Sequence, residues 1–328
     1  MSWFLLPFLA ACSPVGAPGP ADAPTVEFVV PKGATARALG PSLAEAGLVH
    51  GDWAWALFLR TADDTRCVKA GKHAVSPSMT AEALLAELCK LPLPDDAAVK
   101  VLEGWRIRDI DAAIATLGLA PEGAYVAATR TAQGYTVAFP LPSSGVDGAP
   151  PTLEGYLYPD TYLVPSDAFD VRALVQRQLD RFAEQFWTAG ATTLGARSLH
   201  DVVIMASMLE REEPSPANRP LVAGILWKRA DKGWALGVDA TSRYTLPDWN
   251  DRDSFVRKLR DEADPWNTRK RPGLPPTPIG NPSVDALRAA ASPQPSDYWF
   301  YLHDAERTLH PSRSDREHEA LRRKYDVR

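Results

Sequence analysis

The sequence predicts a mixed α+β fold in two domains, and three observations support it. A run rich in β-branched residues at 26–31 and a short strand-like run at 71–75 are each followed by apolar residues at helical spacing. A new strand near Val99 begins a second, larger section. Three longer helical patterns follow there, and no internal repeat occurs along the chain.

The first domain, assigned to residues 26–98, has a predicted β-α-α-β-α order. A turn at Lys32-Gly33 ends the first strand, and Gly47 ends the helical pattern that starts at residue 34. A domain of this size is near the lower limit for independent folding. The remaining predicted elements are a helix over 52–61, a strand over 71–75 and a helix over 79–90.

The second domain, assigned to residues 99–328, begins with the strand near Val99 and a helix that ends at Gly118. A Gly-, Pro- and Ser-rich surface loop is expected over 134–152. Ser198 is placed to cap a helix that Pro214 stops. The longer helices are predicted over 168–187, 198–213 and 219–232.

Composition and charge are those of an ordinary globular protein. The 328 residues are 45% hydrophobic, which is enough for one large core or two smaller ones. The 36 basic and 41 acidic residues give a net charge of −5 without a basic stripe, so no nucleic-acid partner is expected. The six histidines are scattered and no HExxH motif occurs, so neither a metal nor another cofactor is expected.

The N-terminus predicts an exported lipoprotein. Residues 1–11 form an apolar run that is too short to span a bilayer, which needs roughly 20 residues. Its end, Leu9-Ala10-Ala11-Cys12, matches the bacterial lipobox, in which the cysteine is acylated. We therefore expect a signal peptide over 1–11, a lipid on Cys12 and a flexible Pro/Ala/Gly tether over 12–25. The alternative is an ordinary apolar N-terminus with a chance cysteine, since no Lys or Arg precedes the run.

Two further cysteines, Cys67 and Cys89, remain if Cys12 carries lipid. An even pair in an oxidising compartment could form a disulfide. Two buried free thiols are the alternative, and the sequence leaves both open.

The helix over 198–213 combines an apolar body with an acidic end. It is apolar almost all round, which is typical of a buried helix. At 100° per residue, Glu212 lies between the directions of Met205 and Met208. A carboxyl that is partly desolvated at a helix C-terminus has a raised pKa, as a general acid requires. The alternatives are a solvated terminal Glu run, or Glu212 pairing with Arg211.

Two other segments have the composition of sugar-binding sites. LEGYLYPDTYLVP over 153–165 places three tyrosines around an aspartate, and WNTRKRPGLPPTPIGNP over 266–282 is a proline-rich loop with polar side chains. Aromatic faces and amide groups often bind sugars. The alternative is that the tyrosines are core residues and the prolines only shape a loop.

Together these segments resemble the endolytic murein transglycosylase family, also called MltG or YceG-like. The resemblance runs from about residue 26 to 312 and depends on ASMLEREE, LEGYLYPDTY, LGVDATSRY, WNTRKRPGLPPTPIGNPSVDALRAAASP and YWFYL. It implies a small LysM-like domain followed by an α+β catalytic domain. It also implies that the catalytic residue is the second Glu of A-S-x-x-E-x-E, which is Glu212 here.

The resemblance further implies an endolytic lytic transglycosylase that acts on nascent glycan strands. In this reaction the 6-hydroxyl of N-acetylmuramic acid attacks its own C1, so one glutamate serves as acid and base. Peptidoglycan is then the substrate, and peptidoglycan synthases are candidate partners. The expected location is the periplasmic face of the inner membrane, through the lipid anchor. Candidate supporting residues are Glu210, Asp239 and Thr241, and candidate sugar contacts are Tyr158, Asp160, Asn267, Thr268 and Asn281.

Two motifs depart from the family pattern. Gly237-Val238-Asp239-Ala240-Thr241 stands where Q-T-D-P-T is usual, and Trp266-Asn267-Thr268-Arg269 stands where Y-N-T-Y is usual. Two rival functions follow: a muramidase-type hydrolase with a second acid, and a non-catalytic peptidoglycan-binding lipoprotein.

Overall fold

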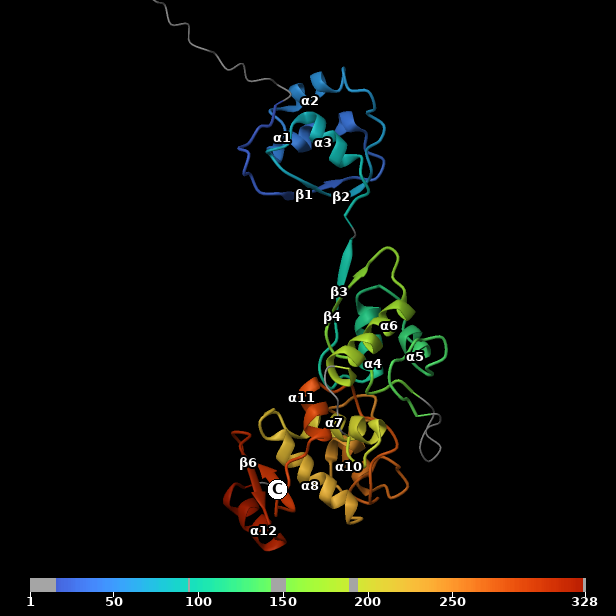
Figure 1. Ribbon diagram of the computed structural model, residues 1–328, viewed down its shortest axis with the longest axis vertical. Helices are drawn as coiled ribbons and strands as arrows, with labels where there is room; N and C mark the ends of the chain where they lie inside the picture. Colours follow the sequence, from blue (N-terminus) through green and yellow to red (C-terminus); the bar gives the residue numbers. More distant parts are fainter. Residues whose placement is uncertain (1–15, 94, 143–151, 189–193, 327–328) are drawn as a thin grey trace, which may run out of the picture. The chain divides into compact units, whose positions relative to one another are not determined.

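The computed structural model describes residues 16–93, 95–142, 152–188 and 194–326. The chain divides into two compact units, one ending at Asp96 and the other starting at Ala97 (Figure 1). The lipidation predicted at Cys12 and the signal peptide lie outside the described residues. Within those residues, no helix has both the length and the hydropathy needed to cross a bilayer.

The first unit has the β-α-α-β-α order predicted from its sequence. Its elements are β1 (Val26–Val30), the 3₁₀ turn η1 (Ala36–Leu39), α1 (Gly40–Glu45), α2 (Asp52–Phe58), β2 (Gly71–Val75) and α3 (Ala81–Leu88). The two strands pair antiparallel, with Val26 opposite Val75 and Val30 opposite Gly71. The single helix expected from residue 34 is divided into η1 and α1, because Pro41 starts a new helix in its first turn.

The core of the first unit lies between the two-stranded antiparallel sheet of β1 and β2 and the three helices. Phe28 and Val30 alternate inward on β1, as the period of a strand requires. Trp55 is 1% exposed, and its indole nitrogen donates to the carbonyl of Ala36 at 2.7 Å. The other fully buried large side chains are Leu43, Leu48, Leu84 and Leu88.

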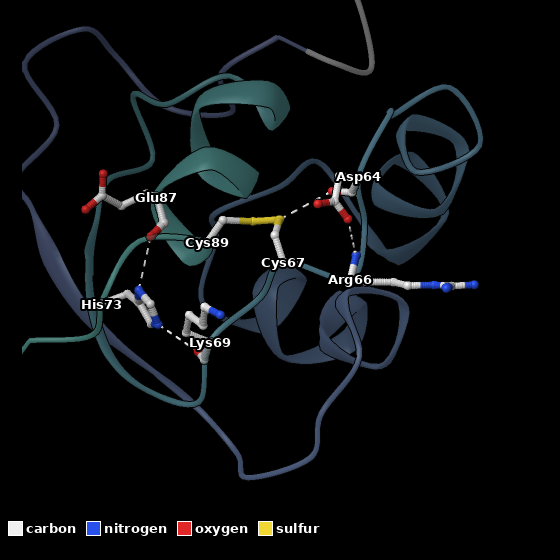
Figure 2. Close-up of a disulfide and its surroundings, with 7 residues drawn as sticks. All are labelled: Asp64, Arg66, Cys67, Lys69, His73, Glu87 and Cys89. Atoms are coloured by element: carbon white, nitrogen blue, oxygen red, sulfur yellow. Dashed lines mark hydrogen bonds between the residues drawn. A yellow bond between two sulfur atoms is a disulfide. The ribbon is translucent and has the colours of Figure 1, made fainter.

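A disulfide joins Cys67 to Cys89 in this unit, with their Cα atoms 4.9 Å apart (Figure 2). It ties the loop between α2 and β2 to the C-cap of α3. Beside it, the ring nitrogens of buried His73 on β2 lie 3.1 Å from the Glu87 carbonyl and 2.9 Å from the Lys69 carbonyl. These contacts hold the α2–β2 loop, β2 and α3 together.

The second unit is mostly helical with two small two-stranded sheets. β3 (Asp96–Lys100) pairs with β4 (Thr161–Pro165), and β5 (Phe300–His303) pairs antiparallel with β6 (Leu309–Ser312). The helices are α4 (Ile107–Thr116), α5 (Ala124–Ala128), α6 (Val171–Phe182), the π-helical turn η3 (Ala183–Trp187), α7 (Leu199–Glu212), α8 (Arg219–Asp231), α9 (Asp239–Arg243), α10 (Arg252–Arg260), α11 (Val284–Ala291) and α12 (Asp315–Lys324).

Helix α7 packs against α8, α9 and α11. Its residues form part of the buried core of this unit, and Figure 1 shows it beside α11. Its body from Val202 to Leu209 is buried all round, as predicted from its composition. The helix starts where the sequence indicates: the hydroxyl of Ser198 accepts from Asp201 N, and the Asp201 carboxylate accepts from Ser198 N. Pro214 directly follows the C-cap residue Glu213, so the helix cannot continue and its last turn always ends at the same residues.

Several boundaries differ by a few residues from the sequence-based expectation, and two of them illustrate the differences. The helix expected over 168–187 is α6, capped by Asp170, with the π-helical turn at its end. The strand expected near Val99 begins earlier, at Asp96. Both differences concern the ends of elements, which local sequence patterns fix poorly.

Candidate active site at the end of helix α7

Three glutamates in the last turn of α7 and at its C-cap face different surroundings. Glu210 and Glu212 lie in the last turn and Glu213 is the C-cap residue. Successive residues point about 100° apart on a helix, so each carboxylate contacts different elements. Arg211 points elsewhere again, with its guanidinium 4.3 Å from the ring centre of Trp249. The pairing of Glu212 with Arg211 that the sequence left open is therefore not formed.

Glu212 is a largely enclosed carboxyl with one neutral donor. The phenolic oxygen of Tyr301 donates to its Oε2 at 3.0 Å. Burial raises the pKa of Glu212 from 4.5 to about 7, and the Tyr301 hydrogen bond opposes this rise. The charge of Asp239 also raises this pKa, whereas His303 and Arg269 lower it. A carboxyl with a pKa near neutrality can both give and take a proton.

Strand β5 places two side chains against the end of α7. Tyr301 and His303 are two residues apart and so lie on the same side of the strand. The Nε2 of His303 lies 3.0 Å from Oε2 of Glu213, whose other oxygen accepts from Ser215 N at 2.8 Å. Burial, and next the charge of Glu212, raise the pKa of Tyr301 well above 10, so it stays a proton donor.

Asp239 at the start of α9 forms an ion pair with Arg269. Within this pair, Nε of Arg269 donates a hydrogen bond to Asp239, and that bond is the largest cause of the raised pKa of Arg269. Arg269 is one of the residues that depart from the expected Y-N-T-Y pattern, so this chain adds a cation near Glu212 at that place. The positive charge partly offsets the effect of Asp239 on the Glu212 carboxyl.

Threonine hydroxyls connect the start of α9 to the proline-rich loop. The hydroxyls of Thr241 and Thr268 are 3.0 Å apart, and the Thr268 hydroxyl accepts from Val238 N at 3.0 Å. The amide of Asn267 donates to the carbonyls of Lys258, Leu259 and Asp261 at 3.0, 3.2 and 2.8 Å. Thr241, Asn267 and Thr268 are all buried, so they fix the loop beside Asp239.

Asn281 and Glu154 join the other end of this loop to the tyrosine-rich segment. The oxygen of the Asn281 amide accepts from Gly155 N and Leu157 N at 2.9 and 3.0 Å. Its nitrogen donates to the Trp105 carbonyl at 2.9 Å and to Glu154 at 3.2 Å. Burial raises the pKa of Glu154 to about 8. Sequence reasoning did not single out Glu154.

The YceG-like family matches residues 28–324, nearly the whole chain. The chain belongs to this family. A curated relative from Streptococcus pneumoniae serotype 2 (strain D39), named endolytic murein transglycosylase, is 25% identical over 315 residues. That match covers 87% of this chain but 56% of the relative, so the YceG-like chain spans little more than half of the pneumococcal protein's length.

Two other comparisons agree with this membership. A relative of the same name from Bacillus subtilis strain 168 is 23% identical over 314 residues, which is 92% of this chain and 85% of the relative. A crystal structure of a putative YceG-like protein from Listeria monocytogenes has a TM-score of 0.60 at 21% identity, covering 92% of this chain and 100% of that one. This similarity shows a shared fold.

In this YceG-like chain, Glu210 is part of an internal anchor. Its carboxylate pairs with Arg219 at 2.8 Å and accepts from the Ser283 backbone N and hydroxyl at 2.9 and 2.6 Å. Ser283 is also the N-cap of α11. Among the described contacts none joins Glu210 to Tyr301 or Asp239, so the structure gives Glu210 a supporting role in packing.

The remaining predicted sugar contacts lie on another element. Asp160 precedes β4, and its Oδ2 pairs with Nε of Arg181 at 3.2 Å. The Tyr158 carbonyl accepts from the Tyr162 hydroxyl at 2.6 Å. No contact described for Tyr158 or Asp160 reaches Glu212, and their role as sugar contacts stays a prediction. Among the described residues, no group of three or more His, Cys, Asp or Glu side chains could hold a metal.

Proposed function

We propose that the chain is an endolytic lytic transglycosylase that cleaves the MurNAc-β-1,4-GlcNAc bond of peptidoglycan and leaves 1,6-anhydro-MurNAc ends. The observation that carries this proposal is the Glu212 carboxyl, whose pKa of about 7 allows both proton states at neutral pH. The curated relatives bear the name endolytic murein transglycosylase, which gives the reaction class.

The reaction requires one residue that acts first as an acid and then as a base. Protonated Glu212 gives its proton to the glycosidic oxygen as the bond from that oxygen to C1 of MurNAc breaks. The 6-hydroxyl of the same sugar then bonds to C1 and loses its proton to the Glu212 carboxylate. No water is consumed, and the intramolecular attack has a high effective molarity. The enzyme ends the cycle with Glu212 protonated again.

The neighbours of Glu212 suit this single-residue mechanism. A muramidase-type hydrolase needs a second carboxylate that is free to activate water or to attack the sugar. Glu213 is fully buried against His303 and Ser215 N, and Asp239 is paired with Arg269. Tyr301 holds the Glu212 carboxyl by a hydrogen bond that favours its charged form, and thereby keeps its pKa near neutrality.

The surrounding roles form part of the same proposal. We infer that residues 26–98 form a LysM-like domain that binds the wall polymer, and that residues 99–328 form the catalytic domain. A lipid on Cys12 would hold the enzyme at the periplasmic face of the inner membrane, where nascent strands and the peptidoglycan synthases that make them are found.

The test is the chemistry of the new chain ends. The chain is incubated with uncross-linked glycan strands, and the products are analysed by mass spectrometry. We expect internal cleavage with 1,6-anhydro ends. Reducing ends without anhydro sugars would instead identify a hydrolase, and intact strands would identify a binding protein.

A further inference from the structure

A groove in the first unit combines a cationic rim with an apolar floor. It has a volume of about 530 Å³ and lies between residues 34–37, at the start of η1, and residues 56–68, from α2 into the loop before Cys67. Arg37, Arg60 and Arg66 line it together with the hydroxyl-bearing Thr35 and Thr65. Its apolar lining comes from Ala34, Ala36, Ala56, Leu59 and Val68.

Among the residues that the structure describes, the guanidinium groups of the three groove arginines have no protein partner. All three are exposed, and no ion pair or side-chain hydrogen bond is formed by their guanidinium groups there. Lys72 of the same unit, by contrast, pairs with Glu27 and Asp95. The nearby Asp64 carboxylate accepts from the Arg66 backbone N at 2.9 Å, while the Arg66 side chain extends away from it and from the disulfide (Figure 2).

The two segments that form the groove are held in place by a disulfide and by hydrogen bonds within the first unit. The disulfide fixes the loop directly after Arg66, and the Trp55 indole bond to the Ala36 carbonyl joins α2 to η1. The Thr35 hydroxyl accepts from Ala38 N at 3.3 Å and so caps η1. A groove that is already shaped loses little conformational entropy when a ligand binds.

We propose that this groove binds the carboxylates of the stem peptides carried by uncross-linked peptidoglycan strands. A guanidinium group matches a carboxylate with two parallel hydrogen bonds, and cationic side chains on separate segments match a ligand with several separated charges. The apolar lining suits the methyl groups of alanine residues. A neutral glycan chain offers nothing for the three cations to pair with.

This inference deepens the proposed function, on which it rests, by stating which feature of the strand the enzyme selects. Stem peptides carry free carboxylates, and cross-linking consumes terminal ones. A groove that reads these charges would direct the enzyme to strands that have not yet been joined to the wall.

The test measures binding by the full chain carrying Glu212→Gln, so that turnover does not interfere. The probes are a disaccharide pentapeptide with a free glutamate carboxylate and the same disaccharide without peptide, its lactyl carboxyl capped as the methylamide so that it carries no anion, titrated by calorimetry. The test variant adds Arg60→Gln with Arg66→Gln. The matched control adds Lys32→Gln with Lys69→Gln, which removes the same charge from exposed positions of the same unit outside the groove lining.

We expect the arginine variant to bind the pentapeptide probe about tenfold or more weakly, since each lost charge-assisted bond contributes to affinity. The lysine control should stay within about twofold, and the peptide-free disaccharide should bind weakly to every variant. Equal binding of both probes, or equal weakening by both pairs of substitutions, would overturn the proposal. Arginine-dependent binding to anionic lipid vesicles without binding of the pentapeptide would overturn it too.

A second readout separates this proposal from the proposed function. With Glu212 intact, the arginine variant should release anhydro products from peptide-free strands whose lactyl carboxyls are capped as methylamides as fast as the unsubstituted chain does. It should also lose any preference for stem-bearing strands. If the unsubstituted chain forms no anhydro ends while arginine-dependent binding persists, the groove stands and the proposed reaction fails. If the arginine substitutions lowered the rate of anhydro-product release more on peptide-free strands than on stem-bearing strands, the groove proposal would be contradicted.

Discussion

Glu212→Gln and Glu210→Gln form a matched pair: the first should lose activity and gain stability, and the second should lose stability and keep most of its activity. The rise of the Glu212 pKa from 4.5 to about 7 corresponds to about 3 kcal/mol when the carboxyl is charged. Since the folded state binds this proton more tightly than the unfolded state, the stability of the parent chain falls as pH rises between about 4.5 and 7. A glutamine at position 212 does not ionise, so it removes this loss of stability at higher pH.

Glu212→Gln should therefore unfold at a higher temperature than the parent above pH 7, and at about the same temperature below pH 4.5. Residual exposure of the side chain limits the gain to less than about 3 kcal/mol. Anhydro-product formation should fall by at least about 10²–10⁴-fold, since one residue serves as both acid and base.

Glu210→Gln breaks an ion pair whose side chains are 6% and 5% exposed, and leaves Arg219 without its anion. We expect a loss of about 3 kcal/mol. The folded fraction should keep most of its rate, because Glu210 contacts Ser283 and Arg219 but not the Tyr301 side of the turn. The measurements are thermal melts at pH 4 and pH 8 and mass spectrometry of anhydro products. Near-parental activity of Glu212→Gln, with loss in Glu210→Gln, would refute the assignment of the catalytic glutamate.

Three further outcomes are expected. Tyr301→Phe removes the hydrogen bond that lowers the Glu212 pKa, so the pH–rate profile should move to higher pH by about one unit. An unmoved profile would show that this bond does not set the proton affinity of Glu212. Thiol titration of the unfolded, unreduced protein should detect neither Cys67 nor Cys89; two reactive thiols would reject the bridge. Its closure should contribute roughly 3 kcal/mol. Cys12→Ala should release the protein from membranes, whereas an unacylated, freely soluble parent would contradict the lipid anchor.

Local sequence signals were enough to place α7. The reciprocal cap of Ser198 and Asp201 starts it, Pro214 follows its end, and its uniformly apolar body indicates burial. The first residues of α8 and the glycine after its end were equally readable, with Pro220 in the first turn and Gly233 just beyond.

The partners of Glu212 could not be predicted from the sequence, because they come from distant parts of the chain. Tyr301 is separated from Glu212 by 89 residues, and His303 from Glu213 by 90. The YWFYL motif over 298–302 contributed only to the family resemblance. Tyr301 in this motif and His303 directly after it are two residues apart, which places them on one face of a strand.

The asparagines illustrate a different limit of sequence reasoning. Asn267 and Asn281 have the amide groups that often bind sugars, yet both are fully buried and their amides bond to backbone groups of the protein. Composition cannot distinguish an amide that binds a ligand from one that fixes a loop, since both uses need the same donors and acceptors. Glu154 was missed although it is the second residue of LEGYLYPDTYLVP, because no periodic pattern in the sequence indicates that its carboxyl is buried.

The last turn of α7 also constrains how this part of the gene can vary. Glu210, Glu212 and Glu213 face three different environments only because of their fixed angular spacing. One inserted or deleted residue upstream in the helix would rotate all three by about 100°. The Glu212 carboxyl would then face a new neighbour instead of Tyr301, and the carboxyls of Glu210 and Glu213 would lose their partners. Substitutions can accumulate along this helix, but changes of length between Ser198 and Pro214 should be eliminated by selection.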